Sequence, residues 1–226
     1  MQIDHPLVYA SYFITCSFLV TTGTITFIEA LRTPIVPMRH ILNLETCISI
    51  VAAYFYGKFI TLIESKSDKS VEEKETEITK NRYVDWMITT PIMLLVLILA
   101  FQYNTGKPGV KLLDYTLILL MNYGMLIFGY LGEIGQISRL LGNFVGFIFF
   151  GLMYAFMYWK YLLKTKGGNN ATNRGLFLAF FVLWAFYGIF YQMSDSYKNI
   201  GYNILDLLSK CFVGIYFWSV SSNIFV

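Results

Sequence analysis

A lysine and an aspartate lie four residues apart in the middle of a long apolar segment. The segment 200–221 is long enough to cross a bilayer as a helix, which takes roughly 20 residues. Lys210 falls near its midpoint, and Asp206 lies one turn earlier on the same helix face. A charge at that depth costs on the order of 3 kcal/mol even on a lenient insertion scale. Two interpretations follow: a buried structural ion pair, or a covalently modified amine with the carboxylate as its counter-ion.

A second group of ionisable side chains falls in the apolar segment near 79–102. Arg82, Asp85 and Thr89 recur at spacings of three and four residues, so a helix presents them on one face. Asp85 then lies a turn or two inside the membrane, between an arginine and a hydroxyl, which keeps a carboxylate ionised until a proton reaches it. Pro91 is expected to kink or loosen this helix locally. The alternative interpretation is an ordinary interfacial Arg–Asp pair at a helix end.

Aromatic and small residues at helical spacing occur in two further apolar segments. Trp184, Tyr187 and Tyr191 follow one another at spacings of three and four. Met125 and Gly129 are one turn apart, where the small residue leaves room for a bulky group. Each pattern alone is most often core or lipid-facing filler. Together with a buried amine, two carboxylates and an arginine, they describe the environment that a conjugated, positively charged imine needs.

The composition as a whole is that of a membrane protein. The chain has 226 residues, of which 56% are hydrophobic, 18% aromatic and only 14% charged, and its mean hydropathy is +0.56. The net charge of +3 gives no indication of a nucleic-acid partner. We expect seven membrane spans, near 7–31, 40–63, 79–102, 111–131, 135–163, 174–194 and 199–223. The sequence therefore predicts an all-α membrane protein, a single seven-helix domain over residues 1–226.

Lysine and arginine in the connections predict the orientation. The basic residues of the first, third and fifth connections are Arg32, Arg39, Lys107, Lys111, Lys160, Lys164, Lys166 and Arg174. The other side carries Arg139 and Lys198, with further lysines diluted by acids in the connector 64–77, which we interpret as a solvated loop or short hairpin. Because cytoplasmic loops are enriched in lysine and arginine, we expect the amino terminus outside and the carboxyl terminus in the cytoplasm.

The three cysteines, Cys16, Cys47 and Cys211, all fall within apolar segments. They show no metal-ligand spacing and share no loop. We therefore expect free thiols, with neither a disulfide framework nor a metal site.

Taken together, these motifs resemble those of the microbial (type 1) rhodopsins, retinal-binding seven-helix proteins that include bacteriorhodopsin. The resemblance covers nearly the whole chain. It rests on Arg-Tyr-x-Asp-Trp-x-x-Thr-Thr-Pro at 82–91, Asp-x-x-x-Lys at 206–210 and Trp-x-x-Tyr at 184–187. The stretch Phe-Gly-Tyr-Leu-Gly-Glu at 128–133 is similar to the proteorhodopsin-like branch. The short loops resemble those of the compact rhodopsins carried by giant viruses of algae and other protists.

The resemblance implies a seven-helix bundle that encloses all-trans retinal and assigns roles to its charged residues. Lys210 would bear retinal as a protonated Schiff base. Asp85 would be the primary counter-ion and proton acceptor, and Asp206 the second counter-ion. Arg82 would lie outward of both and swing as charge moves, while Thr89 would hydrogen-bond Asp85.

The resemblance also implies a retinal pocket, in which Trp86 and Trp184 sandwich the polyene. The residues expected around the chromophore are Tyr83, Trp86, Thr90, Asn122, Met125, Gly129, Trp184, Tyr187 and Tyr191. Where the family often has a proline one residue after the sixth-span tyrosine, this chain has Gly188. That change is expected to loosen the pocket wall without changing the chemistry.

The function that the resemblance implies is a light-driven outward proton pump rather than an enzyme. At the position where proton-pumping relatives carry the cytoplasmic donor carboxylate, this chain has Val96, so we expect a slow photocycle. Glu45 and, after it, Asp114 are the acids expected to replace the missing donor. The expected partners are the lipid bilayer, retinal, protons and further copies of the chain in a trimer or pentamer.

Three alternatives stay open at this point. One is a light-gated ion channel, in which Glu45 lines a hydrated path between the first, second and seventh helices. Another is a photosensory rhodopsin that signals through a partner. Outside photochemistry, the chain would be a structural or receptor-like seven-helix membrane protein with a buried Lys–Asp pair.

Overall fold

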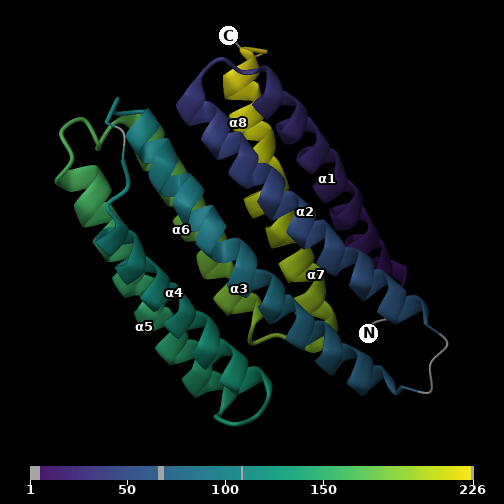
Figure 1. The fold of residues 1–226 in the computed structure, drawn as a ribbon. Coiled ribbons are helices and arrows are strands. Elements are labelled where there is room, and N and C mark those ends of the chain that lie inside the picture. The colour runs from purple at the N-terminus through teal and green to yellow at the C-terminus, as the bar shows by residue number, and fades with distance from the viewer. Residues whose placement is uncertain (1–5, 66–68, 108, 225–226) are drawn as a thin grey trace.

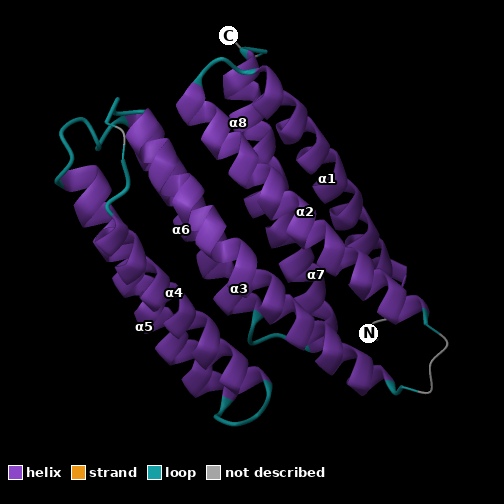
Figure 2. Cartoon of the chain, viewed as in Figure 1, coloured by secondary structure: helices purple, strands orange, loops and turns teal. Residues whose placement is uncertain are grey.

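The computed structural model describes residues 6–65, 69–107 and 109–224 of the chain. In that part of the chain every regular element is helical, and the helices lie side by side in a bundle (Figures 1 and 2). The α-helices and the two π-helical turns, η1 and η2, are α1 (Pro6–Arg32), α2 (Val36–Glu64), α3 (Val71–Tyr103), α4 (Leu112–Glu133), α5 (Arg139–Met157), η1 (Tyr158–Leu163), α6 (Ala171–Phe190), α7 (Asp195–Asp206), η2 (Leu207–Cys211) and α8 (Phe212–Ser222).

Seven continuous rods among the described residues are long and apolar enough to cross a membrane. One of them, Arg139–Leu163, joins α5 and η1, and another, Asp195–Ser222, joins α7, η2 and α8. The predicted all-α, seven-helix membrane fold is therefore confirmed. We call the end of the bundle where α1 begins the amino-terminal end, and the opposite end, where α8 stops, the carboxyl-terminal end (Figure 1).

The third rod begins earlier than its apolar pattern predicts, at Val71. The side chain of Ser70 accepts a hydrogen bond from the backbone N–H of Glu73, and the Glu73 carboxylate accepts one from the Ser70 N–H. This capping box satisfies backbone donors at the helix start, so the polar sequence there becomes helical. The connector predicted over 64–77 is thus partly helix, and residues 66–68 of it lie outside the described residues.

Pro91 lies inside α3, between Met87 and the carboxyl-terminal half of the helix. Because proline has no N–H, the carbonyl four residues earlier loses its helical partner. That carbonyl, of Met87, accepts a hydrogen bond from the Tyr123 hydroxyl of α4 at 3.3 Å. The carbonyl of Pro91 itself accepts one from the Tyr115 hydroxyl at 2.9 Å. Two α4 tyrosines thus secure α3 where the proline loosens it.

The three cysteines are free thiols, as the sequence predicts. Cys47 is exposed, Cys16 is partly buried, and Cys211 is buried in the π-helical turn η2.

Candidate functional site

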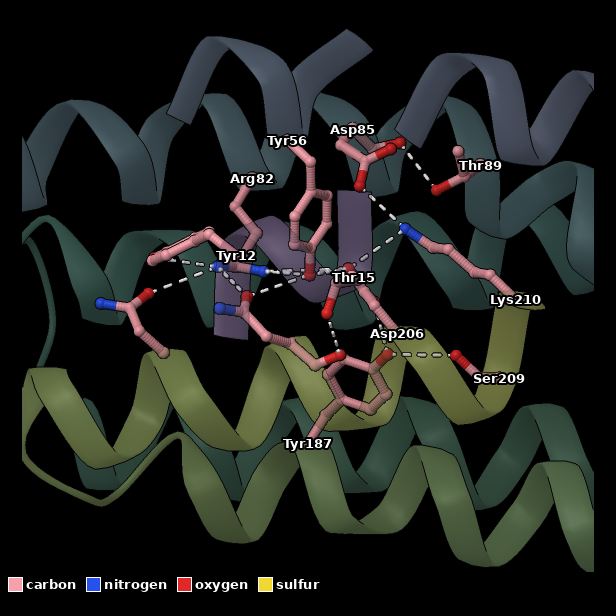
Figure 3. Close-up of polar contacts among 12 residues, drawn as sticks. Tyr12, Thr15, Tyr56, Arg82, Asp85, Thr89, Tyr187, Asp206, Ser209 and Lys210 are labelled. Carbon is pink, nitrogen blue, oxygen red and sulfur yellow. Dashed lines mark hydrogen bonds and ion pairs between the residues drawn. The ribbon is translucent and has the colours of Figure 1, made fainter. Parts of the chain in front are cut away.

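Lys210 and two aspartates meet at the centre of the bundle (Figure 3). The Lys210 Nζ lies 2.8 Å from Asp85 Oδ2 on α3 and 3.4 Å from Asp206 Oδ2. All three side chains are at most 1% exposed. The spacing within the seventh span predicts the pairing of Asp206 with Lys210, and the resemblance to the microbial rhodopsins implies Asp85 as a second carboxylate beside the amine. The structure brings the three groups together.

The helix that carries Lys210 changes its winding at that residue. Leu207–Cys211 forms the π-helical turn η2, between the α-helical segments α7 and α8. A π turn inserts an extra residue into the helical repeat and occurs frequently at functional sites. The apolar segment 199–223 predicts one uninterrupted helix here, because a π turn has no clear signature in residue spacing.

The two carboxylates differ in how completely they are hydrogen-bonded. Asp206 accepts bonds from the Tyr187 hydroxyl at 2.6 Å and the Tyr56 hydroxyl at 2.8 Å. Asp85 Oδ1, in contrast, has no hydrogen-bond partner among the described residues. The Thr89 hydroxyl donates to the backbone carbonyl of Asp85 at 2.9 Å, not to its carboxylate as expected. Asp85 therefore has an oxygen available to accept a proton, while both oxygens of Asp206 are engaged.

Arg82 lies on the amino-terminal side of the two aspartates, completely surrounded by protein. One of its terminal nitrogens is 3.8 Å from Asp206 Oδ2. Its further hydrogen-bond acceptors are Asn203 Oδ1 at 2.9 Å, Tyr12 Oη at 3.2 Å, Tyr56 Oη at 3.3 Å and Asn199 Oδ1 at 3.4 Å. The guanidinium also lies over aromatic rings of α1, α2 and α7, which stabilise a cation.

Sequence reasoning missed these four partners of the arginine. A signal existed for the two asparagines, because Asn199, Asn203, Asp206 and Lys210 recur at helical spacing and share one face of the seventh span. No such signal existed for the tyrosines, which come from other helices.

Tyr56 connects Arg82 with Asp206, and removing its hydroxyl will test that connection. In Tyr56→Phe the buried carboxylate and the buried guanidinium each lose a partner, so we expect the free energy of unfolding to fall by about 1–3 kcal/mol. Thermal unfolding of the purified protein in detergent measures the change. Tyr54→Phe is the matched control, because Tyr54 is 66% exposed, and an equal loss in both variants would contradict the role of the Tyr56 hydroxyl.

An apolar cavity extends from Lys210 between α3, α4, α5 and α6. Of the residues expected around a chromophore, those that line it are Tyr83, Trp86, Thr90, Met125, Gly129, Trp184, Tyr187 and Tyr191. Gly188, expected in the pocket wall, also lines it. Further lining residues, which were not expected there, are Met93, Leu126, Gly142, Asn143, Gly146, Phe147, Phe150 and Tyr202. Asn122 was expected in this lining, but it lies behind it, where its Nδ2 donates to Thr90 Oγ1 at 2.9 Å.

Two glycines of the cavity lining let an aromatic side chain pack directly on the helix backbone. A Cβ atom on Gly129 would lie 2.8 Å from the hydroxyl oxygen of Tyr83. A Cβ atom on Gly188 would lie 2.5 Å from the ring of Phe147, which packs directly on this glycine. The wall is therefore not open at Gly188, because a phenylalanine from α5 occupies the space that a larger residue would take.

The cavity suits a long apolar group attached at Lys210. Its walls are aromatic and aliphatic, and its charged groups are confined to the end where Lys210 and Asp206 lie. The free amine of Lys210 stands where an imine nitrogen would be, within hydrogen-bonding distance of Asp85. The residues present thus fit retinal bound covalently to the Lys210 Nζ.

The three positions considered for proton uptake lie in different surroundings. Val96 is fully buried in the apolar cluster of the carboxyl-terminal half of the bundle. Asp114 forms an ion pair with Lys160 at 2.9 Å near that end. Glu45 is 1% exposed, and its Oε2 has no hydrogen-bond partner in the described part of the chain. Of the two acids, Glu45 alone is buried without a cationic partner in the described structure.

Comparisons with known proteins show the family to which the chain belongs. The family model described as "Bacteriorhodopsin-like protein" matches residues 8–224. A green-light absorbing proteorhodopsin from Gamma-proteobacterium EBAC31A08 is 30% identical over 162 residues, which are 62% of this chain and 60% of that relative. The match thus spans less than two thirds of the relative's length.

Solved structures include a viral rhodopsin, OLPVRII, with 55% sequence identity and a TM-score of 0.87, covering 97% of this chain and all of that one. A blue light-absorbing proteorhodopsin from Med12 has 20% identity and a TM-score of 0.73, covering 96% of each chain. The proton pumping rhodopsin AR2 from the marine alga Acetabularia acetabulum has 17% identity and a TM-score of 0.78, covering 99% of this chain and 98% of that one. The last two show a common fold, whereas the first agrees with the viral branch named from the sequence. With a buried lysine, two aspartates and an apolar cavity beside them in a seven-helix bundle, the chain belongs to the bacteriorhodopsin-like protein family, the microbial rhodopsins.

Proposed function

We propose that the protein is a light-driven outward proton pump in which all-trans retinal is bound to Lys210. The observation that carries this proposal is the 2.8 Å contact between Lys210 Nζ and an Asp85 carboxylate whose other oxygen is free of protein partners among the described residues. Bound retinal supplies light absorption and a change of shape that disturbs this contact. Asp85 is then the group placed to accept the proton that leaves the Lys210 nitrogen.

Asp206 and Arg82 have different tasks in this scheme. Asp206, held by two tyrosine hydroxyls, keeps a negative charge beside Lys210 throughout. Arg82 responds when Asp85 becomes neutral, because the attraction between them weakens and its longer hydrogen bonds to neutral oxygens are easily exchanged. A shift of the guanidinium toward the amino-terminal end raises the positive potential there and favours release of a proton from that end.

The direction of transport follows from the proposed orientation. The chain is an integral multi-pass membrane protein, and the excess of lysine and arginine in the connections at the carboxyl-terminal end favours that end as cytoplasmic. Release at the amino-terminal end is then outward. We further propose that the protein assembles as a trimer or pentamer, the states common in this family.

Uptake from the cytoplasmic side is expected to be slow, because Val96 offers no acid at the usual donor position. We assign the donor role to Glu45, which is buried, whereas Asp114 is held by Lys160. In Glu45→Gln, recovery of the dark absorption after a flash should slow by about tenfold or more. Time-resolved absorption measures this, with Asp114→Asn as the matched control. Recovery as fast as in the unchanged protein would remove Glu45 from the role.

Illumination of cells or lipid vesicles that contain the protein will test the function itself. We expect external acidification of cells in the light, abolished by a protonophore uncoupler. Under voltage clamp the photocurrent should remain outward across the range of potentials. Passive currents that reverse with voltage would instead support a light-gated channel, and photochemistry without any current would support a photosensory role.

A further inference from the structure

A line of buried polar side chains connects the level of Lys210 with the carboxyl-terminal end of the bundle, away from α3. It lies where α1, α2 and α8 meet, and we call it the polar seam. Its members are Thr22, Thr26, Glu29, Glu45, Thr46, Ser49 and Ser221, and each is at most 9% exposed. On α1 the inward-facing members follow one another at spacings of four and three residues, so they form one continuous helix face.

The inner end of the seam lies close to Lys210. Gly214, one turn beyond Lys210, is where Thr22 and Glu45 converge: a Cβ atom there would lie 2.6 Å from Thr22 Cγ2 and 3.4 Å from Glu45 Oε2. Ser49 is one turn from Glu45 on α2 and packs against Gly23 of α1. The absence of a side chain at Gly214 therefore lets Thr22 of α1 pack against the lysine-bearing helix, with the Glu45 carboxyl group at contact distance from the same position.

Three oxygens at this inner end, Thr22 Oγ1, Glu45 Oε2 and Ser49 Oγ, are buried without an oxygen or nitrogen partner among the described residues. Buried hydroxyl and carboxyl groups are almost always hydrogen-bonded, and where protein supplies no partner an ordered water does so. Three such oxygens on facing turns of α1 and α2 mark a site for internal water. That water would lie between Glu45 and the turn that holds Lys210.

The outer half of the seam contains two hydrogen bonds between side chains of different helices. The hydroxyls of Thr26 and Thr46 lie 2.9 Å apart. Closer to the carboxyl-terminal end, Ser221 donates to Glu29 Oε1 at 2.8 Å. Glu29 is in the last turn of α1, so this second carboxylate is placed close to the aqueous boundary.

The usual route along α3 has the opposite character. Around Val96 the inward-facing residues of α3 are Met93, Leu94, Leu97, Ile98 and Phe101, all buried in one apolar cluster. These five side chains offer neither a proton nor an ordered water a hydrogen bond. The seven polar side chains of the seam, in contrast, lie beside α1, α2 and α8.

We propose that the polar seam is the proton-uptake path of this protein, with Glu29 as its entry group and an internal water held by Thr22 and Ser49 as the link between Glu45 and Lys210. The inference rests on the proposed function and adds the route and two further residue roles to it. Glu45 breaks its O–H bond and passes the proton through the water to the Lys210 nitrogen. Glu29 then returns a proton to Glu45 along the hydroxyls of the seam, and Glu29 is reprotonated from bulk water.

Flash photolysis of the full-length, retinal-loaded protein will test the path, with a pH-indicator dye to record proton uptake. The variants are Glu29→Gln, which keeps a hydrogen-bonding amide beside Ser221, and Thr22→Val with Ser49→Ala, which removes the hydroxyls that hold the water. We expect both to slow uptake and recovery by about tenfold or more. A small permeant weak acid such as azide should restore the rate, because it delivers protons without the seam.

Neighbouring threonines on α1 provide matched controls. Thr21 and Thr24 are exposed, and each hydroxyl donates only to the carbonyl four residues earlier, at 2.9 Å. Thr21→Val and Thr24→Val should leave the recovery rate unchanged. The infrared C=O band of protonated Glu45 should shift in Thr22→Val with Ser49→Ala, because its hydration changes, and should stay in place in the controls.

Two results would overturn the proposed path. One is recovery at the normal rate in Glu29→Gln and in Thr22→Val with Ser49→Ala. The other is slow recovery that azide fails to restore, which indicates a general loss of structure. Because uptake is recorded in detergent, it does not depend on vectorial transport. If proton uptake depends on the seam but the photocurrents in membranes are passive and reverse with voltage, the proposed pump function would be wrong. The proposed uptake path would still hold.

Discussion

Lys210→Ala, purified and incubated with all-trans retinal, will show no visible absorption band. The side chain is 1% exposed at the end of the apolar cavity, and its Nζ is the amine that the cavity lining and both carboxylates surround. Without it there is no amine at this position to form the covalent bond or to carry the positive charge. The expected effect is complete loss of pigment, measured as visible absorbance per mole of folded protein.

A second buried lysine of the same helix provides the control. Lys198 is also 1% exposed, but it is not among the residues that line the cavity, and its Nζ contacts Asp195 at 2.7 Å and Glu133 at 2.9 Å. Lys198→Met should lower stability and still form pigment. If the Lys210 variant were coloured while folded, or if both variants were colourless while folded, the assignment of Lys210 would be wrong.

Asp85→Asn will abolish light-driven proton transport while the protein still binds retinal. Asparagine is close to aspartate in size, so it preserves packing against Lys210, yet it does not accept a proton at neutral pH. Because a positioned acid or base contributes typically 100-fold or more to proton transfer, we expect the rate of external acidification to fall by at least about 100-fold. The measurement is the initial rate of light-induced pH change per mole of pigment.

We expect the fall in the acidification rate to depend on which carboxylate is removed, not merely on the loss of one acid. Asp114→Asn removes an aspartate that is ion-paired with Lys160 near the carboxyl-terminal end, and it should retain most of the transport. Continued pumping in a pigmented Asp85→Asn protein would exclude Asp85 as the acceptor.

The sequence was sufficient to predict groups that share a helix. Asp206 with Lys210, and Arg82 with Asp85, lie together because helical spacing alone places them on one face. Seven apolar segments likewise predicted the membrane fold. Most of the pocket was identified through the resemblance of short motifs to those of a known family.

Contacts between helices were much less predictable. Tyr12 and Tyr56 reach Arg82 because α1 and α2 rotate those particular side chains inward, and rotation about a helix axis depends on how all neighbours pack. Asn122 shows the same limit on a smaller scale, since a modest rotation of α4 places it behind Thr90 instead of in the cavity. Whether the Thr89 hydroxyl donates its hydrogen bond to the Asp85 carboxylate or to the Asp85 backbone carbonyl depends on a single side-chain rotamer.

The two α4 tyrosines that donate hydrogen bonds to the backbone of α3 around Pro91 have a mechanical consequence. A helix with a missing backbone bond bends most easily at that point, and here the loosened turn lies directly after the residues that face Lys210. Tyr115 and Tyr123 fasten both sides of this hinge to α4. Flexing of α3 is therefore transmitted to α4 instead of being lost as local fraying, so strain created beside Asp85 reaches the far wall of the cavity.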